Sequence, residues 1–216
     1  MSGARGVRFS RDELGDLALA WLALGVAFAV FFLGGGTGLV RVLARGEVGT
    51  LAGAVGVSLL TAGVAFLLHE LGHKVVAVRF GQVARFRADY GMLFLAVVSA
   101  LAGFLFAAPG AVHHRGRLTP RESGLIALAG PAANLALALA FAPLALLGAT
   151  GGVGIVALVG ARGLAINLVL AAFNLVPYGP LDGRTVLSWS TAVWALTFLP
   201  TAAVALLVVV VGGVGF

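Results

Sequence analysis

FLLHELGH at residues 66–73 ends an uncharged segment that begins at Val48 and is long enough to cross a bilayer. On a helix, His69 and His73 lie one turn apart on the same face, so both imidazoles can bind one zinc ion. Glu70 then lies beside the metal, where its carboxylate can take a proton from a water molecule. The alternative for Glu70 is an ion pair with Lys74, four residues further along the helix. The motif predicts a membrane-spanning helix that carries a zinc site.

The composition is far more apolar than that of a soluble domain. The 216 residues are 61% hydrophobic and only 10% charged, and the mean hydropathy is +1.09. The chain has no cysteine, which excludes disulfides and thiolate metal sites. The net charge of +6 comes from basic residues scattered between apolar segments, so we expect a lipid bilayer and no nucleic acid as partner.

The uncharged segments predict an all-α polytopic membrane protein with about five transmembrane helices. A break near Gly148, Gly151, Gly152 and Gly154 divides a segment that is too long for one crossing. The helices are expected near residues 14–34, 49–77, 122–147, 155–177 and 187–212. The expected organisation is an N-terminal segment with the first helix, a catalytic membrane core and a C-terminal helix, at residues 1–48, 49–185 and 186–216.

The apolar segment 91–108 has basic residues on both sides. Lys74, Arg79, Arg85 and Arg87 precede it, and Arg115, Arg117 and Arg121 follow it. Because basic residues favour the cytoplasmic side, both flanks are expected there, and one full crossing cannot return to the side it left. The segment is therefore predicted to be a re-entrant or membrane-associated hairpin that breaks at Gly103, Pro109 and Gly110. In this topology the N-terminus, the zinc site and eleven of the fourteen basic residues lie on the cytoplasmic side of a cell membrane.

NLVPYGPLDG at residues 174–183 is the second segment that points to a site. Its two prolines and two glycines cannot continue a helix, and irregular backbone at membrane depth lines a cavity or is buried in protein. Asp182 can supply a third zinc ligand and leave the fourth position to water. The alternatives are that Asp182 pairs with Arg184, or that the third ligand is Asp89, His113 or His114.

Three motifs together resemble those of the site-2 protease family of intramembrane zinc metalloproteases: HELGH at 69–73, GPAAN at 130–134 and the segment 174–183. The resemblance implies three core helices around one zinc ion per chain, with His69, His73 and Asp182 as ligands and Glu70 as catalytic base. It also implies transmembrane protein substrates and places Asn134 near the active site. There Asn134 either assists catalysis at the substrate or oxyanion, or hydrogen-bonds between helices. Arg184 departs from the family pattern, in which a second glycine is common, and this leaves substrate choice and gating open.

The predicted function is hydrolysis of peptide bonds in or near transmembrane segments by an intramembrane zinc metalloprotease. The alternatives are a zinc-binding transporter or channel, and a catalytically silent relative that binds membrane proteins. The alternating residues of 83–89 predict a short surface strand, and this strand or the loop at 91–112 is expected to pair with extended substrate. The oligomeric state stays open.

Overall fold

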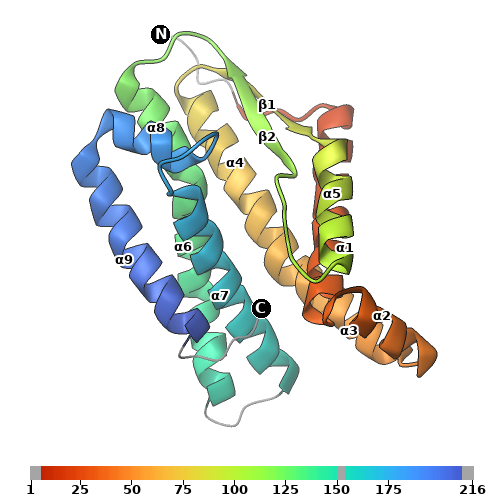
Figure 1. Cartoon of the computed structure of the whole chain (residues 1–216). Coiled ribbons are helices and arrows are strands. Elements are labelled where there is room, and N and C mark those ends of the chain that lie inside the picture. Colours follow the sequence, from red (N-terminus) through yellow and green to blue (C-terminus); the bar gives the residue numbers. More distant parts are fainter. Residues whose placement is uncertain (1–5, 150–153, 211–216) are drawn as a thin grey trace.

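Five long apolar helices dominate the computed structural model, which describes residues 6–149 and 154–210 (Figure 1). They are α1 (Arg11–Phe32), the continuous helix Val48–Arg79, α6 (Pro120–Ala149), α7 (Gly154–Asn174) and α9 (Thr191–Val210). Each has the length and composition to cross a membrane. The predicted all-α polytopic fold is confirmed. Arg5, the predicted break residues Gly151 and Gly152, and the outer ends of the segments 1–48 and 186–216 lie outside the described residues.

The helix Val48–Arg79 changes its geometry in the middle. It consists of α3 (Val48–Ser58), a π-helical turn η1 (Leu59–Gly63) and α4 (Val64–Arg79). Trp21 of α1 donates its indole N–H to the carbonyl of Leu59 over 3.0 Å, which satisfies a backbone group in the irregular turn. α4 departs from the direction of α3 and enters the body of the protein, with the HELGH motif in the middle of α4 (Figure 1).

Several helix boundaries lie a few residues from their expected positions, and two of these differences have a clear local cause. The first helix ends at Phe32, because Gly34 and Gly35 adopt positive φ angles and start the short helix α2 (Gly35–Ala44). The last helix does not begin at 187: residues up to Trp189 belong to α8 (Asp182–Trp189). Ser190 is extended and its hydroxyl accepts the N–H of Val193, so it caps the start of α9.

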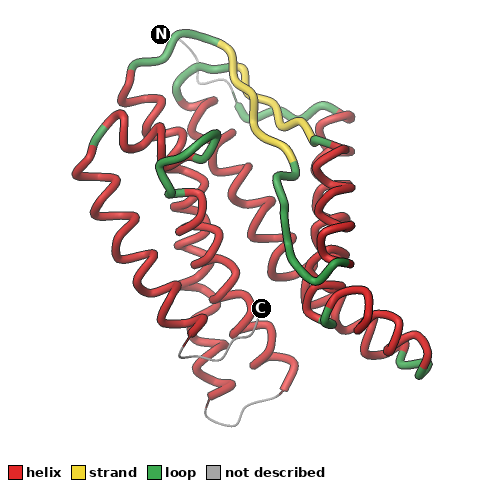
Figure 2. Tube along the Cα trace, in the orientation of Figure 1, coloured by secondary structure: helices red, strands yellow, loops and turns green. Residues whose placement is uncertain are grey.

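The segment 91–108 forms the predicted hairpin. α5 (Tyr90–Leu101) runs beside α1, and the chain then returns as an extended segment to β2 (Gly110–Arg115) (Figure 2). The N–H of Asp89 donates to the carbonyl of Pro109 over 3.1 Å, so the hairpin leaves from and returns to the same end of the protein. Positive φ angles at Gly103 and Gly110 allow the turns there.

The predicted surface strand is β1 (Val83–Ala88), which pairs with β2 in an antiparallel sheet. In this register Phe86 lies opposite Val112. The sheet packs across α1 and α4 through Phe86, whose ring lies edge-on to Phe66 at 5.7 Å between centroids. The α1, α5 and sheet side therefore faces the α6, α7 and α9 side, with α4 between them (Figure 1).

Candidate metal centre

His69, His73 and Asp182 bring three ligand atoms to one point. The Nε2 atoms of the two histidines are 3.0 Å apart, and each lies 3.3 Å from Oδ2 of Asp182. Tetrahedral zinc with ligands at 2.0–2.2 Å places neighbouring ligand atoms about 3.3 Å apart. Among the described residues this is the group of histidine and acidic side chains that could hold a metal ion. Oδ2 of Asp182 is buried without a hydrogen-bond partner, so the donor set fits zinc and leaves this oxygen to bind it.

The irregular segment before α8 presents Asp182 to the histidines. Asp182 is the first residue of α8, and Gly183 lies directly against the backbone of Leu175. A side chain at Gly183 would collide with that backbone, since its Cβ would lie only 2.8 Å from Cα of Leu175. Trp194 of α9 donates its indole N–H to the Leu175 carbonyl over 2.8 Å. The segment is thus held from both sides, and Oδ2 of Asp182 lies 3.3 Å from Nε2 of each imidazole.

Hydrogen bonds to the Nδ1 atoms fix how both imidazoles are oriented. His69 Nδ1 lies 2.7 Å from Oδ1 of Asn134, and His73 Nδ1 lies 2.7 Å from the carbonyl oxygen of Ile126. Because both partners are carbonyl oxygens, which only accept, each Nδ1 carries the proton. Each Nε2 then keeps its lone pair for a metal, an arrangement typical of histidine ligands.

Asn134 lies beside the candidate metal centre, and both its amide oxygen and its amide nitrogen hydrogen-bond to other residues of the protein. Its amide nitrogen donates to the carbonyl of Ala65 and to Oδ1 of Asn167, both over 3.0 Å. Both asparagines are fully buried. This geometry favours a role for Asn134 in positioning His69 over a role at the substrate oxyanion. Asn167 was not predicted from the sequence, although a polar residue inside an apolar helix is a signal for such a buried hydrogen bond.

Substituting Asn134 with leucine is expected to weaken zinc binding by about 10–100-fold, because His69 loses the acceptor that orients it. Competition with a zinc chelator measures the dissociation constant in detergent. Gln82→Leu is the matched control, since it also removes a buried amide but one that bonds to Phe80 and Arg117. Equal zinc affinity in wild type and Asn134→Leu would contradict the positioning role.

Glu70 is buried beside the histidines and does not pair with Lys74. Its Oε2 accepts the N–H of Val112 from β2 over 3.1 Å. The ammonium of Lys74 instead lies 2.5 Å from the carboxylate of Glu13 on α1. The ion pair that the spacing of Glu70 and Lys74 allows is therefore absent, and the Glu70 carboxylate stays on the side of the candidate ligands.

The alternative third ligands lie elsewhere. Asp89 caps the start of α5, where its side chain accepts the N–H of Met92 over 3.0 Å. His113 and His114 are exposed on β2. Partial burial lowers the pKa of His114 below its ordinary value, and the charges of His73 and His113 lower it further. None of the three joins the group that could hold a metal.

Gly130 closes the metal centre from the side of α6. A Cβ built on Gly130 would lie 2.6 Å from Nε2 of His69 and closer still to Nε2 of His73. Any side chain here would therefore occupy the space in front of both ligand atoms. Gly130 is the first residue of the GPAAN motif at 130–134.

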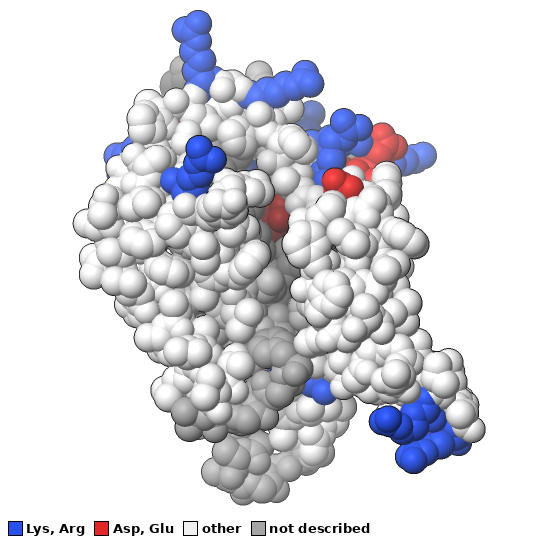
Figure 3. Space-filling model, viewed as in Figure 1, with Lys and Arg blue, Asp and Glu red and all other residues white. Residues whose placement is uncertain are grey.

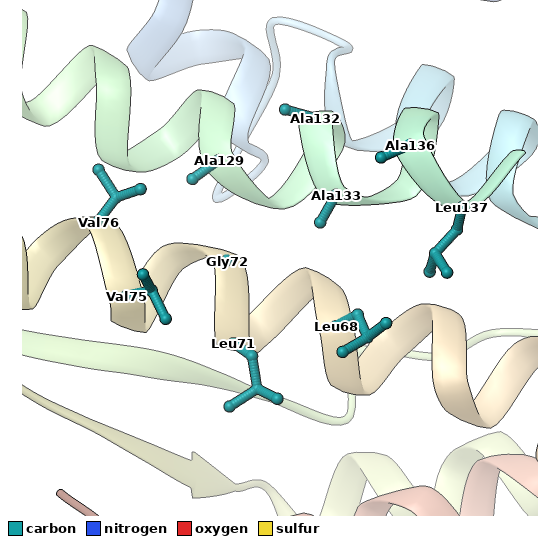
Figure 4. Close-up of a pocket in the computed structure, with 10 residues that line it drawn as sticks. All are labelled: Leu68, Leu71, Gly72, Val75, Val76, Ala129, Ala132, Ala133, Ala136 and Leu137. Atoms are coloured by element: carbon teal, nitrogen blue, oxygen red, sulfur yellow. The ribbon is translucent and has the colours of Figure 1, made fainter. Parts of the chain in front are cut away.

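The site lies in a hollow between the two sides of the protein. Figure 3 shows acidic atoms deep between the α1 and α5 side and the α6 to α9 side, with basic residues gathered at the same end. A separate groove of about 560 Å³ lies between α4 and α6 (Figure 4). Its walls are aliphatic side chains and glycine, including Leu68, Val75 and Ala133, so it offers no polar group for chemistry.

Comparisons with known proteins identify several relatives. A protein named "Putative zinc metalloprotease MJ0611" from Methanocaldococcus jannaschii is 39% identical over 197 residues, which cover 89% of this chain and 92% of that protein. The similarly named YwhC of Bacillus subtilis is 35% identical over 59% of this chain and 66% of its own length. Rip3 of Mycobacterium tuberculosis is 37% identical over 62% of this chain but only 30% of its own length. No family model and no solved structure matches the chain.

Proposed function

The chain belongs to the zinc metalloprotease family of these relatives, and on this premise we propose that it is an intramembrane protease of the site-2 type. Such an enzyme hydrolyses peptide bonds in or near transmembrane segments of membrane proteins. The observation that carries the proposal is the place of the metal centre: two ligands lie on a membrane-spanning helix and the third at a break between helices. Water and an unwound substrate can both reach such a site near a helix end.

The roles follow from the site geometry. We assign His69, His73 and Asp182 as the ligands of one zinc ion per chain, and Glu70 as the catalytic base. When bound, zinc supplies a Lewis acid that acidifies water and polarises the scissile carbonyl. Asn134 and the Ile126 carbonyl hold the two imidazoles in the tautomer that can bind it.

Glu70 moves the protons of the reaction. Its carboxylate takes a proton from the attacking water and then gives it to the leaving amine nitrogen. The hydrogen bond from Val112 fixes one carboxylate oxygen and so orients the base. Burial keeps bulk water from competing for that oxygen.

The position of β2 beside Glu70 supports a substrate-binding role for this strand. A transmembrane helix hides its peptide bonds in its own hydrogen bonds, so it must unwind before hydrolysis. The outer edge of β1 is covered by α1, because Glu13 accepts the N–H of Phe86 and Asp16 that of Ala88. The outer edge of β2 faces Glu70 through Val112. We therefore place extended substrate on β2, by strand addition beside the base.

The distribution of basic residues supports a cytoplasmic site. Figure 3 shows basic residues gathered at the end that carries the sheet, and a second basic group at the opposite end. The helix α2, which contains Arg41, lies at that opposite end (Figure 1). By the positive-inside rule, the N-terminus and the zinc site face the cytoplasm. Residues 49–185 carry all the proposed catalytic residues and remain our proposal for the catalytic core.

The test is to purify the chain in detergent, measure its zinc content and assay cleavage of a single-span membrane protein. We expect one zinc per chain, cleavage that a chelator stops and added zinc restores, and loss of both zinc and cleavage in Asp182→Ala. Glu47→Ala, which removes a carboxylate from the exposed ion pair with Arg45 between α2 and α3, is the control. Wild-type zinc transport into vesicles without cleavage would favour a transporter, and bound zinc with neither activity would favour a silent relative. Either result overturns the proposal.

A further inference from the structure

Lys74 is a buried cation next to the candidate centre. It follows His73 directly, and the whole residue is only 1% exposed. Its ammonium donates to the carboxylate of Glu13 over 2.5 Å and to the carbonyl of Arg8 over 2.7 Å. It also lies 3.8 Å from the centre of the Phe9 ring. The segment before α1 and the first turn of α1 thus surround this lysine completely.

Glu13 holds two elements with the same oxygen. Its Oε1 accepts from Lys74 on α4 and, over 2.9 Å, from the backbone N–H of Phe86 on β1. Glu13 is 2% exposed, so both bonds are shielded from water. A carboxylate this deeply buried is retained only with such charge-assisted partners.

The sheet connects Glu13 to the catalytic base. Phe86 and Val112 are opposite each other in the register, and each directs its N–H out of the sheet. Phe86 donates to Glu13, whereas Val112 donates to Glu70. The two strands are therefore held between two buried carboxylates, and the second of these is the proposed base.

Without Glu13, the nearest acid on the helix of Lys74 is Glu70. The two residues are four positions apart, with the glutamate first, which is the favourable order for an ion pair on a helix. An ammonium that lost its buried partner would be left without compensation and would seek another carboxylate. Glu70 would then be drawn away from water and substrate.

We propose that Glu13 is a positioning residue for Glu70: it sequesters the Lys74 ammonium away from the base and anchors the sheet whose Val112 N–H orients that base. This inference rests on the proposed function, because it gives Glu70 the role of base. Ser10 caps the start of α1 by accepting the Glu13 N–H, while the Glu13 side chain points into the protein toward Lys74.

The test compares three variants that break the same ion pair differently. Glu13→Gln keeps an acceptor for Phe86 but frees the ammonium, Lys74→Met removes the ammonium, and the double variant does both. We expect kcat to fall by about tenfold or more in Glu13→Gln, with zinc content and KM little changed. The double variant should retain kcat close to that of the wild type, because it leaves neither a free ammonium nor an unpaired buried carboxylate, and Lys74→Met should lose less kcat than Glu13→Gln. If Glu13→Gln does not fold, Glu13→Asp, which shortens the reach of the carboxylate, should show the same loss in kcat.

Equal losses of kcat in Glu13→Gln and Lys74→Met would overturn the proposal, because the pair would then serve stability alone. A Glu13→Gln variant as active as the wild type would overturn it as well. Amide hydrogen exchange tests the anchoring part without an assay of catalysis. Glu13→Ala should speed exchange in residues 83–88, and unchanged exchange there would refute the anchoring. If the wild type cleaves nothing, the proposed function fails, while the exchange measurement still reports on Glu13.

Discussion

Replacing Glu70 with glutamine is expected to lower the rate of substrate cleavage by about 10²–10⁴-fold while zinc stays bound. Glutamine has nearly the same shape and can still accept the Val112 N–H, so the sheet and α4 should keep their positions. Its amide cannot take a proton from water at neutral pH. The three proposed ligands are untouched. The measurements are kcat/KM on a single-span substrate and zinc content by atomic absorption.

The control for this substitution is Glu47→Gln. Glu47 lies between α2 and α3, at the opposite end of the protein, and forms an exposed ion pair with Arg45. The Glu47→Gln substitution removes the same charge as Glu70→Gln and should leave cleavage unchanged, since an exposed ion pair contributes little to stability. If Glu70→Gln cleaved as fast as the wild type, Glu70 would not be the base. If it lost zinc, the residue would have a structural role at the metal.

The spacing of the histidines could be interpreted from the sequence because helical periodicity decides it. Residues four apart share a face on any helix, so the facing of His69 and His73 required only that α4 be helical. The charge distribution likewise decided that 91–108 turns back, since no single crossing satisfies basic residues on both flanks. The hydrogen bond between Asp89 and Pro109 confirms that return.

The partners of the buried polar groups could not be predicted, because they are separated by long stretches of chain. Helix periodicity alone offers Lys74 only Glu70 as an ion-pair partner. In the structure Lys74 pairs with Glu13, which lies 61 residues earlier in the chain. Asn134 similarly bonds to His69 across two helices. Local periodicity carries no information on which of several buried groups will meet, since tertiary packing decides it.

These long-range hydrogen bonds tie the first helix to the predicted catalytic core. The predicted core began at residue 49, after the first helix. Yet α1 supplies Glu13 to Lys74 and Asp16 to the N–H of Ala88. The first helix therefore supports the sheet beside the proposed active site.

Replacing Gly130 with alanine is expected to abolish zinc binding, with a dissociation constant raised by more than about 100-fold, and cleavage with it. The added methyl group would lie 2.6 Å from Nε2 of His69 and still closer to Nε2 of His73, so it would block both proposed ligand atoms. The imidazoles cannot retreat without losing the Asn134 and Ile126 hydrogen bonds. Zinc content after dialysis and chelator competition measure the loss.

Gly53→Ala on α3 is the matched control, because a Cβ there meets no atom within 4 Å. Alanine favours a helix over glycine by roughly 0.8–1.0 kcal/mol, so neither variant should weaken its own helix. Loss of zinc in Gly130→Ala but not in Gly53→Ala would then show that the added methyl group blocks the Nε2 atoms of the two histidines. A Gly130→Ala variant that bound zinc as tightly as the wild type would show that the ion does not sit between these imidazoles and α6, and the assignment of the ligands would have to be abandoned.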